Sequence, residues 1–147
     1  METSIRGHRK SSIVSDTDYE LLATFRHALR EFLYFSEQEA LAAGVAPQQH
    51  QAMLVIRGLP KDNQLTVGEL ARKLKIKHHS AVGLINRMQA DGLVKKCEDP
   101  DNRRQVLVRL ASRGHRILDT LSPVHKAELA RIAPTLRTIL NQIETTS

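Results

Sequence analysis

The residues of this chain that are best suited to hydrogen-bond another molecule lie in two short polar runs. The first is His78-His79-Ser80, with Gly83 just after it, and the second is Asp101-Asn102-Arg103-Arg104. Imidazole, hydroxyl and guanidinium groups bond well to the base edges and phosphate oxygens of nucleic acids. Whether the two runs can act on one ligand depends on the elements that position them.

Two short helices joined by a tight corner are predicted around the first run. Thr66 and Glu69 have the spacing of an N-cap and its partner, so the first helix is expected to begin there. Apolar residues recur at three- and four-residue steps, as Leu70, Ala71 and Leu74 in the first helix and as Ala81, Val82, Ile85 and Met88 in the second. Because only Lys75-Ile76-Lys77 separates them, the pattern predicts a helix-turn-helix.

In a helix-turn-helix the second helix enters the major groove of DNA, and its outward residues meet the bases. We expect DNA contacts from the capping residue of the first helix and from the first part of the second helix with the residue before it. These residues are Thr66, Lys77, His78, His79, Ser80 and Gly83. Arg87, farther along, is expected to contact phosphate and to strengthen binding to all sequences alike. On the opposite arc, Val82, Ile85 and Met88 are expected to hold the helix against the core.

The second polar run lies at the tip of a predicted hairpin. Gly92 is expected to end the helix in a left-handed conformation, and two strands follow at residues 93–97 and 105–110. Arg103 at the tip suits the narrow minor groove of A·T-rich DNA, with Asp101 as its local partner. The dense turn signal around these residues fits an ordinary polar turn as well, and taken alone the residues favour that turn.

Two helices are predicted before the helix-turn-helix. The first spans residues 15–43, with Thr17 and Glu20 as its capping pair. The second restarts at Ala46-Pro47, with proline in its first turn, and ends at Gly58-Leu59-Pro60, and a polar loop follows at residues 61–64.

Two separate helices are predicted after the hairpin. Apolar residues step along one helix at residues 112–132, and a second helix begins beyond Pro134 because proline breaks a helix interior. The fold class is therefore mainly α with a small β-hairpin. A length of 147 residues is that of one ordinary domain.

Positive charge is concentrated in the middle of the chain. The net charge is +6, yet residues 71–116 carry twelve basic and four acidic residues, so the remainder is slightly negative. A basic middle segment of this kind is the electrostatic footprint of a nucleic-acid-binding surface, although a solvated basic face would look the same.

The chain resembles the multiple antibiotic resistance regulator (MarR) family. The resemblance rests on the helix-turn-helix, on Gly92-Leu93-Val94, on the run Asp99-Pro100-Asp101-Asn102-Arg103-Arg104 and on the strand Val106 to Leu110, with long helices on both sides. It implies a winged helix-turn-helix at residues 46–111, dimerisation helices at 15–45 and 112–147, and a flexible basic arm at 1–14, all in a single domain. It also implies that Arg103, beside Asp101 and Arg104, reaches the minor groove.

The resemblance further implies an obligate homodimer on a pseudo-palindromic operator. The apolar face of the last helix agrees with this, because a two-fold dimer buries that face and sets two recognition helices about one DNA turn apart. Relatives of this family bind small phenolic or anionic effectors in a cleft, so Phe25, Phe32 and Phe35, which share a face of the first helix, are a candidate lining. A stripe of aromatic residues at helical spacing is also the pattern of core packing.

Other chemistry is poorly supported. The seven histidines have no ligand-like spacing, and the single Cys97 allows neither an intrachain disulfide nor a thiolate cluster, so we predict no metal and no cofactor. There is no phosphate-binding glycine loop and no nucleophile elbow, which argues against an enzyme. No apolar run could span a membrane and no secretory signal is present, so a cytoplasmic, nucleoid-associated protein is expected.

These features predict a sequence-specific transcription regulator that binds double-stranded DNA, a repressor released by a small effector. Two alternatives remain. One is a winged-helix scaffold that binds another protein, which predicts no salt-dependent affinity for DNA. The other is a redox-responsive repressor that uses Cys97.

Overall fold

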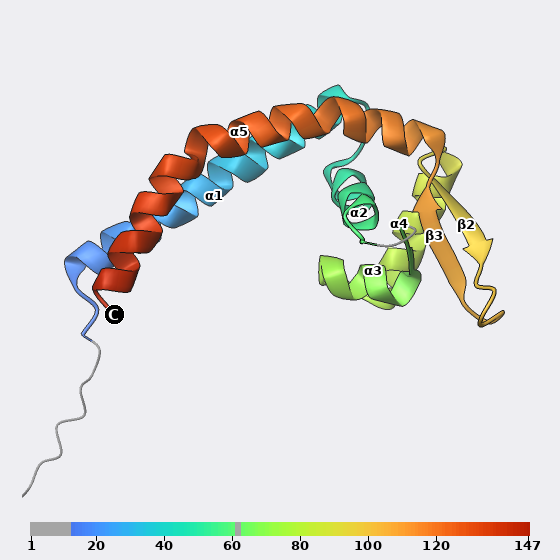
Figure 1. Cartoon of the computed structure of the whole chain (residues 1–147), viewed down its shortest axis with the longest axis horizontal. Helices are drawn as coiled ribbons and strands as arrows, with labels where there is room; N and C mark the ends of the chain where they lie inside the picture. The colour runs from blue at the N-terminus through green and yellow to red at the C-terminus, as the bar shows by residue number, and fades with distance from the viewer. Residues whose placement is uncertain (1–12, 61–62) are drawn as a thin grey trace, which may run out of the picture. The chain divides into compact units, whose positions relative to one another are not determined.

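The computed structural model describes residues 13–60 and 63–147, and within these ranges the chain is mostly helical with one small sheet (Figure 1). The elements in order are α1 (Asp16–Ala42), α2 (Pro47–Arg57), β1 (Gln64–Thr66), α3 (Val67–Leu74), α4 (His78–Ala90), β2 (Val94–Glu98), β3 (Val106–Leu110) and α5 (Ser112–Thr145). This confirms the predicted fold class. The predicted arm at residues 1–14 lies outside the described residues, apart from Ile13 and Val14.

The chain divides into two compact units. The core unit is Tyr34–Ala127 and contains the helix-turn-helix and the sheet. The terminal unit consists of the described parts of Met1–Leu33 together with Glu128–Ser147, that is, the first part of α1 and the last part of α5. The finer predicted division into an arm, dimerisation helices and a winged domain stays a prediction.

The core unit is organised around the buried face of α4. Its side chains Ala81, Leu84, Ile85 and Met88 are at most 1% exposed, and they pack with residues of α2, α3 and the sheet. Val82 was expected on this face, but the structure places it at 38% exposure. The expectation was wrong because the apolar stripe repeats at positions 81, 84, 85 and 88, which turns position 82 out of the core.

The helix-turn-helix has well-defined helix ends. Thr66 caps α3, since its hydroxyl oxygen accepts the Glu69 N–H at 3.1 Å, as the spacing predicted. The helix ends at Lys75, which has a left-handed φ of 57°, and the Ile76 N–H bonds back to the Ala71 carbonyl at 3.0 Å. Gly92 adopts the predicted left-handed conformation after α4, at a φ of 70°. Both helices thus end in hydrogen-bonded turns that redirect the chain sharply.

The sheet has three strands in the order β1-β3-β2, all antiparallel. The prediction of a two-stranded hairpin was incomplete, because Gln64 and its neighbours form a third strand, with Gln64 opposite Arg109, where a polar loop was expected. Three residues are too short for an alternating pattern to be recognised in a sequence. The partner strand β3 decides their conformation.

The C-terminal prediction of two helices was wrong, since α5 continues unbroken through Pro134. Proline lacks the N–H that would bond to the carbonyl four residues before it, but its fixed φ is compatible with a helix. Pro134 lines a groove of about 590 Å³ with Leu21 of α1 and Ile139 of α5, within the terminal unit. In the terminal unit α1 runs alongside this part of α5 (Figure 1), so the helix has a tertiary neighbour where the hydrogen bond is lost.

Polar contacts join the helices of the terminal unit. The capping pair of α1 is Ser15 and Asp18, not the predicted Thr17 and Glu20: the Ser15 N–H donates to Asp18 Oδ2 at 3.0 Å, and Ser15 Oγ accepts the Asp18 N–H at 3.1 Å. These bonds hold the pKa of Asp18 below its usual value, with the backbone N–H of Ser15 as the largest cause. The Thr146 hydroxyl also donates to Asp18, at 3.1 Å.

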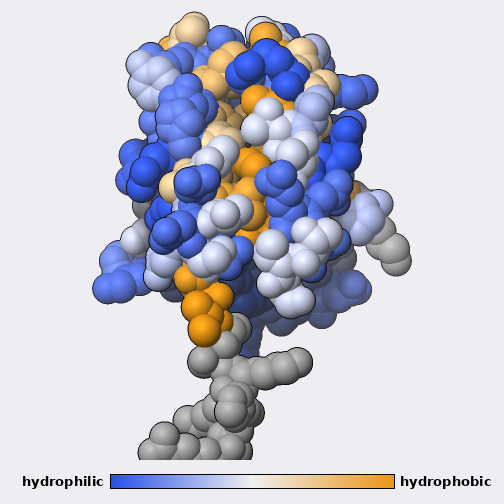
Figure 2. Space-filling view, turned by 90° about the vertical axis from the view of Figure 1, so that its left-hand side faces the viewer, coloured by the Kyte–Doolittle hydropathy of each residue, from blue (hydrophilic) through white to orange (hydrophobic). Residues whose placement is uncertain are grey.

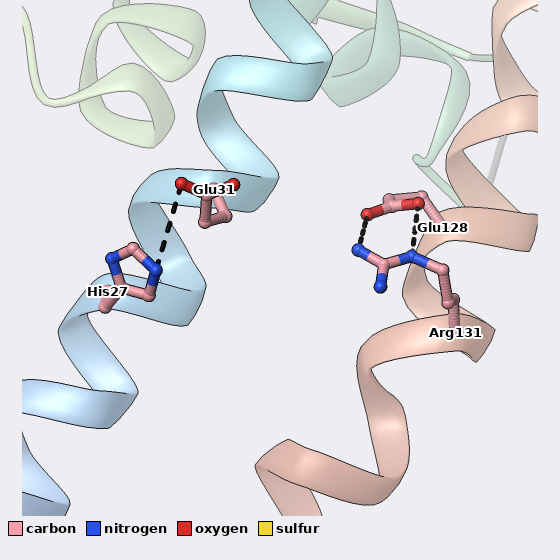
Figure 3. A network of polar contacts seen from close by, with 4 residues as sticks. All are labelled: His27, Glu31, Glu128 and Arg131. Carbon is pink, nitrogen blue, oxygen red and sulfur yellow. Dashed lines mark hydrogen bonds and ion pairs between the residues drawn. The ribbon is translucent and has the colours of Figure 1, made fainter.

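An arginine in α5 forms a two-pronged ion pair within this unit. Arg131 donates from Nε and Nη2 to the two carboxylate oxygens of Glu128, at 3.0 and 2.6 Å (Figure 3). The hydrogen bonds from Arg131 lower the pKa of Glu128. In α1, His27 lies 3.9 Å from Glu31.

The start of α5 lies directly against the backbone before the wing. The Ala111 N–H donates to the Leu93 carbonyl at 2.9 Å, and a Cβ placed on Gly114 would overlap that same carbonyl oxygen. Arg113 adds a bond from Nη1 to the Asp91 carbonyl at 2.6 Å. Only glycine at position 114 allows the helix to approach the chain this closely.

Gly114→Ala is therefore expected to destabilise the fold by roughly 1–3 kcal/mol, because an overpacked side chain must push apart two backbone segments. Urea unfolding followed by circular dichroism measures the effect. Gly68→Ala is the matched control, since a Cβ there meets no atom closer than 3.6 Å. Equal stability of the two variants would contradict the close approach.

Two histidines meet where three helices of the core unit come together. The rings of His50 in α2 and His125 in α5 have centroids 4.7 Å apart, and His50 is only 4% exposed. His125 Nδ1 lies 2.7 Å from the Leu121 carbonyl, which only accepts, so Nδ1 carries a proton. Its Nε2 lies 2.8 Å from Ser36 Oγ in α1. Burial, and then the charge of His125, lower the pKa of His50.

A pH dependence of stability follows from this lowered pKa. The unfolded state binds a proton at His50 more readily than the folded state, so the free energy of unfolding should fall as the pH drops below about 6.5, the ordinary histidine pKa. His50→Gln should lose less stability than the wild type between about pH 7.5 and 5.5 in urea titrations. His115→Gln, at an exposed histidine, should behave as the wild type, and the same pH slope in all three proteins would refute the assignment.

Candidate nucleic-acid interface

The outward face of α4 is polar and open to solvent. His78, His79 and Ser80 in its first turn are exposed, and Gly83 one turn later is half-buried. Asn86 continues the same face, three residues beyond Gly83 and seven beyond His79, and is exposed. Sequence reasoning missed Asn86, although extending the helical period by one more turn would have found it.

The N-terminus of α4 has no side-chain cap. Lys77 occupies the capping position, its side chain makes no capping hydrogen bond, and its carbonyl accepts the Ala81 N–H at 3.0 Å. The N–H groups of the first turn therefore have no partner within the helix and carry partial positive charge. With Lys77 beside them, they form a surface that favours an anion such as a phosphate.

Arg87 lies along the outside of α4. A Cβ built on Gly83 would lie 3.3 Å from Arg87 Nη1, so the guanidinium folds back over the glycine. The small residue thus leaves room for the cation one turn later.

Asn86 is tied to the wing. Lys96 Nζ on β2 donates to Asn86 Oδ1 at 2.6 Å, and both residues are exposed. Lys96 lies opposite Val108 in the sheet register, and Val108 is fully buried, so Lys96 is on the sheet face that turns toward the core and α4. The outward face of α4 and the wing therefore share a polar contact.

The tip of the wing is shaped by two side chains that bond to its own backbone. Asp99 Oδ1 accepts the Asp101 N–H at 2.9 Å, and Asn102 Oδ1 accepts the Arg104 N–H at 3.2 Å. The expected pairing of Asp101 with Arg103 is absent, since neither side chain has an ion pair among the described residues. The turn chemistry of Asp99 and Asn102 fixes the tip and leaves the Arg103 side chain exposed.

A depression of about 430 Å³ lies between α3, the start of α4 and β3. It brings together Thr66, His78 and Arg104, which were predicted as separate contacts, and adds Arg72 of α3. The Arg72 guanidinium reaches back to within 3.6 Å of a Cβ built on Gly68, over the first turn of α3. Arg72 was not predicted because its place depends on how α3 and the wing pack together.

The three phenylalanines proposed for an effector cleft are all half-buried. Phe35 packs edge-on against His125, with ring centroids 5.5 Å apart, in the core unit. Phe25 and Phe32 belong to the terminal unit, whose groove at Pro134 is lined by other residues. An effector site at these phenylalanines stays a prediction.

Cys97 is half-buried on β2, and its thiol lies 3.5 Å from the Leu107 carbonyl. Within residues 13–60 and 63–147, no three His, Cys, Asp or Glu side chains are grouped to hold a metal ion. The helices in these ranges also include none with the length and apolar content to cross a membrane.

The sequence and the fold both match known proteins. The MarR family model matches residues 43–105. The transcriptional activatory protein BadR of Rhodopseudomonas palustris is 32% identical over 81 residues, which are 55% of this chain and 46% of that protein. The chain thus spans about half the length of this relative.

Solved structures share the architecture over most of the chain. AbsC, a MarR family transcriptional regulator from Streptomyces coelicolor, matches with a TM-score of 0.73 and 17% identity over 89% of each chain. Sco3205, a MarR family regulator from the same organism solved in complex with DNA, has a TM-score of 0.69 and 16% identity over 89% of this chain and 85% of its own. At such identities these structures establish the fold alone. The match to residues 43–105 lies in the segment that carries the helix-turn-helix and the wing, and there the chain is similar to the MarR family.

Proposed function

We propose that the protein is a transcription regulator that binds double-stranded DNA through α4 and the wing. The observation that carries this proposal is the shared surface of the two elements: the open polar face of α4 is joined to the wing by the bond from Lys96 to Asn86. A recognition helix enters the major groove while an exposed wing arginine reaches an adjacent minor groove.

The residues divide into two groups by the contacts they suit. His79, Gly83 and Asn86 lie on the outermost arc of α4 and face the bases. The predicted contacts Thr66, Lys77, His78 and Ser80 lie at the helix starts. Arg72 and Arg104 line the depression beside them, and Arg87 lies farther along α4, all three as cations for phosphate. Thr66 acts first as the cap of α3, which sets the direction of that helix.

The proposed unit is a homodimer formed through the terminal unit. Large apolar side chains there are exposed: Tyr19, Leu22, Leu29, Leu33, Leu129 and Leu140 are each between 39% and 63% exposed. Figure 2 shows hydrophobic surface between hydrophilic borders on one face of the molecule. Exposed apolar surface of this kind marks an interaction site, and a two-fold partner would cover it and present two recognition helices to a pseudo-palindromic operator.

A regulator of this kind acts on the genome in the cytoplasm, and the position of its operator in a promoter decides whether it represses or activates. Repression released by a phenolic or anionic effector is the proposed control. A ligand of this class would raise the melting temperature of the protein if it binds the folded state.

The first test is fluorescence anisotropy of the full chain with duplexes from its own promoter region and with random duplex. The expected result is selective binding by a dimer, with affinity falling roughly 10³-fold or more between about 50 and 200 mM salt, because several phosphate contacts release counterions. Weak and equal binding to both duplexes, or none, would favour the protein-binding scaffold instead.

Arg103→Ala tests the wing. We expect about a tenfold loss of affinity for sites flanked by A·T pairs and a smaller loss for G·C flanks, because an arginine is attracted to a narrow minor groove. Lys126→Ala, at an exposed cation of α5, removes the same charge and should bind as the wild type. Unchanged binding of the Arg103 variant would remove this residue from the interface.

A further inference from the structure

Asn86 occupies a base-reading position on α4. It lies on the same arc as His79 and Gly83, and its side chain is exposed. Asparagine commonly pairs with adenine, because its NH₂ group donates to N7 while its amide oxygen accepts from the N6 amino group, so both ends of the amide take part. In this protein one end of the amide is already engaged.

Lys96 fixes the orientation of that amide. Its Nζ lies 2.6 Å from Asn86 Oδ1. An ammonium group has three donors and no acceptor, so the amide must present its oxygen to Lys96 and its NH₂ group away from it. The register of the sheet supports the contact, because Lys96 lies on the face of β2 that turns toward α4.

The pair therefore presents donors on both sides. Asn86 offers its NH₂ group, and Lys96 keeps two further N–H donors beside the occupied oxygen. The major-groove edge of guanine carries two acceptors, N7 and O6, which suits this arrangement. Adenine carries an acceptor and an amino donor, and that donor would face the ammonium group of Lys96.

We propose that Asn86 and Lys96 form one base-reading unit that selects guanine over adenine at one position of each half-site. This inference rests on the proposed function. Lys96 has two roles in this unit: it orients the Asn86 amide, and its own N–H donors bond to the base. A lysine that only neutralises phosphate would have neither role.

The test is selection from a random duplex library with the full-length wild type, Lys96→Met, Lys96→Arg and Asn86→Ala. The wild type should enrich guanine at one position of each half-site. Lys96→Met frees Asn86 Oδ1, so the preference at that position should move toward adenine while the other positions stay unchanged. Lys96→Arg keeps the donors and should keep guanine, and Asn86→Ala should lose the preference there.

Binding to the selected duplex gives the magnitude. Replacing that G·C pair by A·T should weaken wild-type binding about tenfold and Lys96→Met binding less than twofold. Both side chains are exposed, so the variants should melt as the wild type does, which circular dichroism verifies.

The outcomes separate this inference from the proposed function. If Lys96→Met keeps the wild-type base preferences and only binds more weakly, Lys96 is a phosphate contact and the inference fails while DNA binding stands. The inference also fails if the wild type selects adenine or thymine at the position whose base preference is lost in Asn86→Ala. If the wild type enriches no sequence, the proposed function and this inference both fail.

Discussion

The packing of one face of α4 governs the rest of the candidate interface. Leu84, Ile85 and Met88 are buried among side chains of α2, α3 and the sheet, and this burial fixes the rotation of the helix about its axis. Once that rotation is set, His79, Gly83 and Asn86 must point outward. Shifting the buried stripe by a single residue would present a different set of side chains, so the proposed base contacts depend on apolar packing within the core unit.

The end of α4 is the joint at which several elements are held. Gln49 of α2 is buried, and its Nε2 donates to Asp91 Oδ2 at 2.9 Å, while Arg113 of α5 donates to the Asp91 carbonyl. The next residues carry the Leu93 carbonyl, which accepts from Ala111 and admits only glycine at position 114. These bonds fix where the wing begins relative to α4. The contact from Lys96 to Asn86 depends on that placement.

Burial also explains why some polar residues of the core unit favour the neutral form while others keep their charge. His50 is enclosed beside His125, and there its charged form is disfavoured. The cations of α4 and the wing lie in water, where their charge is retained at little cost and is available to a polyanion. Histidine itself occurs in both settings, since His50 is buried while His78 and His79 are exposed.

The sequence by itself determined the elements whose signals are local. Thr66 and Glu69 have the spacing of a cap, Gly92 suits a left-handed residue, and the apolar period of 81, 85 and 88 marks a helix face, so the helix-turn-helix and the wing could be predicted. Only the tertiary structure decided features that depend on distant partners. Strand β1 exists because β3 pairs with it, α5 passes Pro134 because α1 packs beside it, and Val82 is exposed because Leu84 fills the core. Asn86 meets Lys96 only because the sheet packs against α4, and no spacing along the chain encodes a contact between two elements.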